Sequence, residues 1–200
     1  MQFGSSQSMP PVSKNLLIAN CMVFLAQFVF EQQGVRLEQW GALWAWQSPY
    51  FRVWQLVTHM FMHGGFLHLL FNMFCLWSFG TILERDWGPK RFFQFYMVCG
   101  LMAGVTHLLF SSAPAVGASG AIMGLFAAFA YLNPNAPLYL MFIPIPIKAK
   151  YAIPGLMALD IFGIFGGSND NIAHWAHLGG AVTGLIIVII WNKTNRRTFY

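Results

Sequence analysis

Long apolar runs separated by short polar segments dominate the chain. No Asp, Glu, Lys or Arg occurs between Arg91 and Lys148. A membrane-spanning helix needs about 20 mainly apolar residues, and somewhat shorter spans also occur. The runs predict six transmembrane helices, over about 15–33, 66–84, 91–111, 117–132, 150–167 and 172–192. We therefore expect an all-α polytopic membrane protein with one compact bundle, in which residues 1–200 form a single domain.

The composition and the positions of the basic residues agree with a bilayer as the solvent. Only 8% of the residues are charged, against about 25% in a soluble domain. If both termini are cytoplasmic, that side holds nine of the eleven basic residues: Lys14, Arg85, Lys90, Arg91, Lys148, Lys150, Lys193, Arg196 and Arg197. Only Arg36 and Arg52 then lie outside. This bias predicts cytoplasmic termini, in what we expect to be a bacterial inner membrane, and it explains the net charge of +5 without a nucleic-acid partner.

The first outer loop, over about 32–65, is too long for a simple hairpin and contains the tryptophan-rich stretch WGALWAWQSPYFRVWQ. Tryptophan prefers the headgroup level of a bilayer. We therefore expect the loop to lie partly in the outer leaflet as short interfacial pieces. It is either an ordinary aromatic belt or a side wall for substrate entry.

Several polar residues lie in the outer half of the expected spans, where each is costly and is a functional hypothesis by default. His68 and Asn72 are four residues apart, so they share one helix face. His174 and His177 open the last span, and Ser119 opens the fourth. His59, His63 and His68 mark a polar route by which water can reach Ser119 from outside.

Ser119 has two interpretations, a helix-capping serine or a reactive one. Gly120 and Gly124 form one small-residue face, and Gly180 and Gly184 form another, which also carries His177. Two such faces can approach closely enough for the hydroxyl and the imidazole to form a hydrogen bond. The pattern therefore favours a nucleophile with its general base.

Acyl transfer also needs donors for the oxyanion, and His68 and Asn72 are candidates on one face at the right depth. No carboxylate is expected near the histidine. Asp170 falls in an outer loop and Asp160 in the fifth span, and both are interpreted as structural. We therefore expect a Ser-His dyad.

The strings HGGFLHLLFN, GASG and AHLGG, the last followed by a GxxxG pattern, occur in this order on a six-span chain. With GTILERDWGPKRFFQFY they make residues 54–184 resemble the rhomboid intramembrane serine proteases. The resemblance implies that Ser119 is the nucleophile and His177 the base. His68 and Asn72 then assist the oxyanion with the Ser119 backbone N–H, and His63 is a structural or water-holding residue at the mouth of the site.

The same resemblance implies that Glu84 and Arg91 are scaffold residues at the cytoplasmic end. It also implies single-span membrane proteins as substrates, cut near the outer membrane surface, and neither a cofactor nor a metal. The oligomeric state and the identity of the substrate stay open. The supporting residues of the site are His63, Met123, Gly117, Gly120, Gly180 and Gly184.

This chain departs from well-known bacterial members of that family at two places. Met123 occupies the position of a tyrosine that stacks on the catalytic histidine, and a thioether can also pack on an imidazole. A Trp-Arg pair in the first loop reads here as Trp54 and Gln55, which bears on the rigidity of the loop and its lipid contact.

Two alternatives of other classes remain, a histidine-ligated membrane cytochrome and a polytopic transporter. His174 next to His177 is the feature that a haem or metal site could use. A Soret band in the purified protein would indicate the first, and ion-driven uptake into vesicles the second.

Overall fold

The computed structural model describes residues 8–139, 146–166 and 172–194. In chain order its elements are α1 (Pro11–Glu31), α2 (Glu38–Gly41), α3 (Gln55–Thr58), the 3₁₀ turn η1 (His59–Phe61), α4 (Phe66–Cys75), the π-helical turn η2 (Leu76–Gly80), α5 (Thr81–Trp87), α6 (Pro89–Phe110), α7 (Ser119–Leu132), β1 (Pro137–Leu138), β2 (Ile147–Lys148), α8 (Ala149–Gly166) and α9 (His174–Thr194). The two short strands pair antiparallel.

The helical class expected from the apolar pattern is confirmed. Within the described residues, four helical segments are long and apolar enough to cross a membrane, namely Pro11–Glu31, Phe66–Trp87, Pro89–Phe110 and His174–Thr194. The second of these is continuous through α4, η2 and α5. The remaining expected spans, the fourth and fifth, correspond to α7 and α8. The small β-hairpin between these two helices was not expected.

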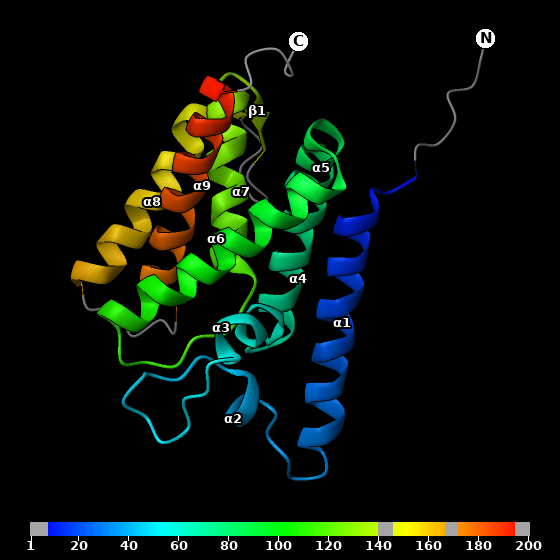
Figure 1. Ribbon diagram of the computed structural model, residues 1–200, viewed down its shortest axis with the longest axis vertical. Helices are drawn as coiled ribbons and strands as arrows, with labels where there is room; N and C mark the ends of the chain where they lie inside the picture. Colours follow the sequence, from blue (N-terminus) through cyan, green and yellow to red (C-terminus); the bar gives the residue numbers. More distant parts are fainter. Residues whose placement is uncertain (1–7, 140–145, 167–171, 195–200) are drawn as a thin grey trace.

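Helix α7 is the centre of the bundle, packed against α6 and α9, while α1 and α8 lie at opposite edges (Figure 1). Every residue from Gly120 to Phe129 is buried. A helix that is apolar on all sides and buried on all sides belongs in a core. The first turn of α1 and the last turn of α9 lie at one end of the bundle, and α2 lies at the other (Figure 1).

The predicted close approach of the two glycine faces is present between α7 and α9. A Cβ at Gly180 would overlap the carbonyl oxygen of Gly120, and a Cβ at Gly184 would lie 2.5 Å from that of Gly124. Both obstacles are backbone atoms, so neither can turn aside. Glycine at these positions therefore sets the distance between the helix that starts at Ser119 and the helix that carries His177.

Gln55 organises the first outer loop. Its side chain is fully buried. Its Oε1 accepts from the backbone N–H groups of Trp44 and Arg52 at 3.3 and 3.2 Å. Its Nε2 donates to the carbonyl oxygens of Trp40 and Tyr50 at 3.3 and 2.9 Å. The uncharged residue at this position thus ties together three parts of the loop, with every amide group used.

The opposite end of the bundle is held by Glu84, which is buried in α5. Its two carboxylate oxygens accept from the backbone N–H groups of Val12 and Ser13, at 2.8 and 2.6 Å. A carboxylate on the first turn of a helix satisfies donors that have no intrahelical partner and matches the helix dipole. Glu84 therefore fastens the start of α1 to the rest of the bundle.

Candidate active site

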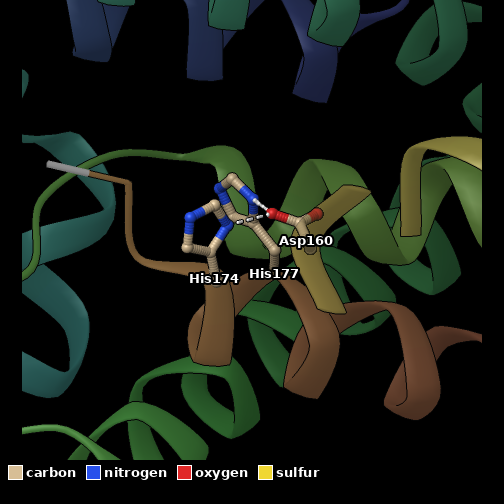
Figure 2. Close-up of side chains that lie close together, drawn as sticks. All are labelled: Asp160, His174 and His177. Carbon is tan, nitrogen blue, oxygen red and sulfur yellow. Dashed lines mark hydrogen bonds and ion pairs between the residues drawn. The ribbon is translucent and has the colours of Figure 1, made fainter. Parts of the chain in front are cut away.

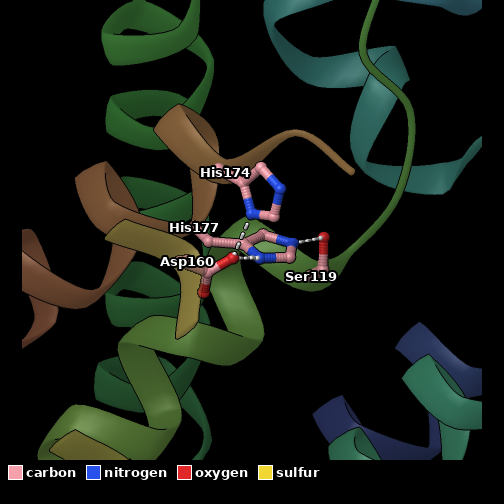
Figure 3. Close-up of polar contacts among 4 residues, drawn as sticks. All are labelled: Ser119, Asp160, His174 and His177. Carbon is pink, nitrogen blue, oxygen red and sulfur yellow. Dashed lines mark hydrogen bonds and ion pairs between the residues drawn. The ribbon is translucent and has the colours of Figure 1, made fainter. Parts of the chain in front are cut away.

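Ser119 and His177 come together at the junction of α7 and α9. Ser119 is the first residue of α7, and His177 lies in the first turn of α9. The Oγ of Ser119 is 2.8 Å from Nε2 of His177 (Figure 3). The hydroxyl is therefore within hydrogen-bond distance of a base, as the chemistry of an activated serine nucleophile requires.

The interpretation of Ser119 as a helix cap is wrong. The N-cap residue of α7 is Ala118, and no side chain caps this helix end. The hydroxyl is directed to the imidazole instead. The backbone N–H groups of the first turn of α7, beginning with Ser119, have no intrahelical partner and lie at the positive end of the helix dipole. They can stabilise negative charge that develops beside the hydroxyl.

Gly117 brings the backbone between His68 and Ser119. Its φ of 122° is in the region that favours glycine. A Cβ at this position would be 2.8 Å from Nε2 of His68 and 3.6 Å from Oγ of Ser119. The Gly117 N–H donates to the carbonyl oxygen of His59 at 2.8 Å. The peptide before Ser119 is thus anchored to the first outer loop, next to the His68 ring.

The His68 ring has a defined orientation. The backbone N–H of Gly64 donates to its Nδ1 at 3.3 Å, so in the neutral ring the proton is on Nε2. That nitrogen faces Gly117. Asn72 is buried one turn further along α4 and donates from its amide nitrogen to the carbonyl oxygen of His68 at 3.0 Å. One amide hydrogen of Asn72 remains for another acceptor.

The expectation that no carboxylate lies near the histidine is wrong. Oδ1 of Asp160 lies 2.9 Å from Nδ1 of His177 and 2.7 Å from Nδ1 of His174 (Figures 2 and 3). Helix α8 carries this carboxylate onto the first turn of α9. The signal that could have found it was in the sequence, because an aspartate inside a span is costly unless it is paired. Asp170 lies outside the described residues.

Asp160, His174 and His177 are also the group best placed to hold a metal ion within the described ranges. One ligand atom from each lies within 4.8 Å of the others. The two nitrogen-to-oxygen separations, 2.7 and 2.9 Å, are hydrogen-bond lengths. These lengths fit hydrogen bonds from the two imidazole N–H groups to the carboxylate.

His63 is held to α1 through its backbone, and its role as a structural or water-holding residue stays a prediction. Its backbone N–H donates to Oε1 of Gln27 at 3.0 Å, and its carbonyl oxygen accepts from Nε2 of the same side chain at 3.1 Å. This pairing joins the segment before α4 to α1. Burial, with a smaller effect from the neighbouring imidazole of His68, lowers the pKa of His63 to about 4. The ring is therefore neutral at neutral pH.

A cavity of about 440 Å³ adjoins this segment, with Gln27, His63 and Gly64 in its lining. Its lining also includes residues of α1, such as Phe24 and Phe28, and does not include Ser119. His59 is not part of this lining. Its ring is buried and donates to the carbonyl oxygen of Gln55 at 2.7 Å. Of the three histidines, His63 alone is in the lining of this cavity, and the expected polar route to Ser119 stays a prediction.

Two further residues that hold the site were not indicated by the sequence pattern. His107 on α6 is buried and donates from Nε2 to the carbonyl oxygen of Ala113 at 2.8 Å, which fixes the segment that leads to Ser119. Gln27 on α1 is the partner of His63 described above. Met123 is buried in the core one turn after Ser119. Its packing on the imidazole of His177 stays a prediction.

Fold and site together define a class: a helical membrane-embedded protein with a serine-imidazole pair between two of its helices. Comparison with known proteins places the chain within that class. A family model described as the Rhomboid domain matches residues 50–193. The chain belongs to the rhomboid family.

Three relatives illustrate the match. The chain is 32% identical to "RHOMBOID-like protein 12, mitochondrial" of Arabidopsis thaliana, over 92% of its own length and 58% of the relative's. It is 35% identical to "Rhomboid protease GluP" of Bacillus subtilis, over 66% of its own length and 24% of the relative's. It is 29% identical to "Rhomboid protease GlpG" of Photorhabdus laumondii, over 97% of its own length and 65% of the relative's. The chain thus spans less than two thirds of each of these relatives.

Proposed function

We propose that this protein is an intramembrane serine endopeptidase that hydrolyses a peptide bond in or near the transmembrane segment of single-span membrane proteins. The observation that carries the proposal is the 2.8 Å separation of Ser119 Oγ and His177 Nε2 inside a helical membrane bundle. The relatives named as rhomboid proteases support the same activity.

In the proposed reaction, Ser119 Oγ attacks the carbonyl carbon of the scissile bond while Nε2 of His177 takes its proton. His177 then gives that proton to the leaving amine, so the peptide bond breaks and an acyl-enzyme remains on Ser119. Water, deprotonated by the same nitrogen, hydrolyses the ester and regenerates the hydroxyl. No cofactor is needed, since every proton moves between these groups and water.

The oxyanion of each tetrahedral intermediate is stabilised by the backbone N–H of Ser119 together with His68 and Asn72. The proton on Nε2 of His68, which faces Gly117, supports this role. Fixed donors next to a developing negative charge act most strongly when water is scarce, as between packed helices. Gly117 lets the His68 ring come this close.

The proposed topology has six membrane crossings, with α7 and α8 as the short fourth and fifth spans, and residues 1–200 as one rhomboid-like domain. Both termini are cytoplasmic, and Ser119 opens toward the outer side, in a bacterial inner membrane. Relatives include mitochondrial proteins, so the orientation of the chain in its membrane needs a test. Reporter fusions at loops on each side measure that orientation. The tryptophan-rich loop then lies against the outer leaflet.

The cytochrome alternative finds no support in the geometry. His174 and His177 are on one helix and share one carboxylate oxygen, whereas a pair of haem ligands must face each other across the iron. No observation in the described residues favours a transporter.

The decisive test compares wild type, Ser119→Ala and Ser112→Ala, the last changing an exposed serine in the segment before α7. A serine-directed fluorophosphonate should label wild type and Ser112→Ala in detergent and should not label Ser119→Ala. Membrane proteins that lose their ectodomains in cells with the wild type, and keep them with Ser119→Ala, are the candidate substrates. Equal labelling of all three proteins would remove Ser119 from the proposed role.

A further inference from the structure

A carboxylate contacts the histidine on the side opposite the serine. His177 uses Nε2 toward Ser119 at 2.8 Å and Nδ1 toward Oδ1 of Asp160 at 2.9 Å. The three side chains come from α7, α9 and α8, and they lie in a row (Figure 3). A merely structural tie between α8 and α9 could use any polar pair along the two helices. Here it uses the second nitrogen of the imidazole that faces the serine.

The hydrogen-bonding capacity of these groups determines where the protons are. An ionised carboxylate only accepts hydrogen bonds, so Nδ1 of His177 carries a proton. In the neutral ring Nε2 then has a lone pair, and it accepts from the Ser119 hydroxyl. This is the tautomer that a general base needs. The orientation of the ring and its tautomer are thus set from the side away from the serine.

We propose that Asp160, itself held by His174, is a positioning residue for His177, so that the site works as a Ser-His-Asp triad instead of a dyad. The proposal rests on the proposed function of Ser119 and His177. The carboxylate fixes the Nδ1–H tautomer in the resting state. It also stabilises the imidazolium that forms when His177 takes the serine proton. Asp160 does not change its own protonation.

Burial of the Asp160 carboxylate in α8 is energetically unfavourable, which indicates a specific role for this residue. Its side chain is only 11% exposed, whereas its neighbours on α8, Leu159 and Phe162, are 65% and 73% exposed on the surface of the bundle. That surface faces lipid in the proposed topology. A carboxylate in such surroundings is retained when it is paired with hydrogen-bond donors. Oδ1 of Asp160 has two such donors, the imidazole N–H groups of His174 and His177.

His174 secures the carboxylate. Its Nδ1 donates to the same Oδ1 at 2.7 Å (Figure 2). Its ring lies against Gly163, one turn beyond Asp160 on α8, where a Cβ would overlap it. The face of α8 formed by Asp160 and Gly163 therefore receives both histidines. Because His174 shares the oxygen with His177, it holds Asp160 in place and does not touch the serine.

A bound metal ion is the competing explanation for two histidines and a carboxylate. Zinc would lie about 2.0–2.2 Å from each ligand atom and would require both Nδ1 atoms to be deprotonated. It would therefore replace the two hydrogen bonds that orient His177. The proposal predicts that a chelator leaves the activity unchanged. Loss of activity with EDTA that zinc restores would overturn it.

The kinetic test measures the rate and the half-saturation concentration of fluorophosphonate labelling for the full chain in detergent. Asp160→Asn keeps the size of the side chain and removes the charge, and it should lower the maximal labelling rate by about 10²- to 10³-fold with half-saturation nearly unchanged. Asp160→Glu restores the charge and should recover part of the rate. His174→Ala should cost less than about tenfold, since it affects His177 through Asp160 and leaves the Asp160 carboxylate in place. Asp86→Asn, which alters an exposed carboxylate in α5, is the matched control and should label at the wild-type rate.

The outcomes separate this proposal from the proposed function. If Ser119→Ala abolishes labelling and Asp160→Asn labels at the wild-type rate, the triad is wrong and the dyad remains. If Ser119→Ala still labels, the proposed function fails first. Should Asp160→Asn fail to fold, ¹⁵N NMR of histidine-labelled wild type decides. A proton on Nδ1 of His177 supports the triad, and a proton on Nε2 alone overturns it.

Discussion

The contact between α7 and α9 offers the most direct way to move His177 away from Ser119 without touching either residue. The change is Gly180→Ala, three residues after His177 on α9. The added Cβ would overlap the carbonyl oxygen of Gly120, which is backbone and cannot turn aside. At Gly184, one turn further from the site, the Cβ would stop 2.5 Å from the carbonyl oxygen of Gly124, about 1 Å short of ordinary contact. Gly184→Ala must push the helices apart by about that amount, and Gly180→Ala by more.

A displacement of about 1 Å between reacting groups can cost about 10²-fold in rate. We expect Gly180→Ala to lose at least that factor in fluorophosphonate labelling rate, and Gly184→Ala to lose less because the strain is further from His177. Both should also melt at lower temperature. In an unstrained helix the same exchange would add about 1 kcal/mol of stability through helix propensity, so a fall in melting temperature reports packing.

Gly155→Ala is the matched control. Gly155 is within α8, and a Cβ there meets nothing within 4 Å. It should label at the wild-type rate and melt at or above the wild-type temperature. If Gly180→Ala matches Gly155→Ala in both measurements, close approach of α7 and α9 does not set the distance between Ser119 and His177.

Three further outcomes test other parts of the molecule. Asn72→Ala should lower kcat by about 10²- to 10³-fold with KM nearly unchanged, as expected for an oxyanion donor; a large fall in melting temperature with normal cleavage per folded molecule would instead make this asparagine an interhelical tie. Glu84→Ala removes the acceptor of the part-buried Val12 N–H and of the buried Ser13 N–H, so it should destabilise the fold by several kcal/mol while labelling per folded molecule stays normal. An unchanged melting temperature would contradict this. Because the pKa of His63 falls from 6.5 to about 4 on folding, the unfolded chain binds the extra proton between these values, and stability is full above pH 6.5 and falls as the pH drops toward 4. His63→Gln should flatten that fall, and equal acid sensitivity of the two proteins would count against the assignment.

Local features were readable from the sequence because they depend on residues close together in the chain. The apolar runs predicted where the long helices lie, since a helix buries its own backbone polar groups in lipid. The spacing of Gly120 and Gly124 predicted a flat helix face, and such faces pack closely. The position of Ser119 between glycines, with His177 on a second glycine face, was enough to bring these two together.

Apart from the two glycine faces of α7 and α9, which helix faces which neighbour was decided only by the tertiary structure. Lipid is as apolar as a helix interface, so Phe92, fully buried, and Phe162, 73% exposed, look alike in the sequence. The rotation of α8 that turns Asp160 toward His177 therefore left no apolar pattern to read. The same holds for Glu84, whose partners on α1 are more than 70 residues away in the chain. Periodicity defines the face of a helix, but the partner of that face depends on how the whole bundle packs.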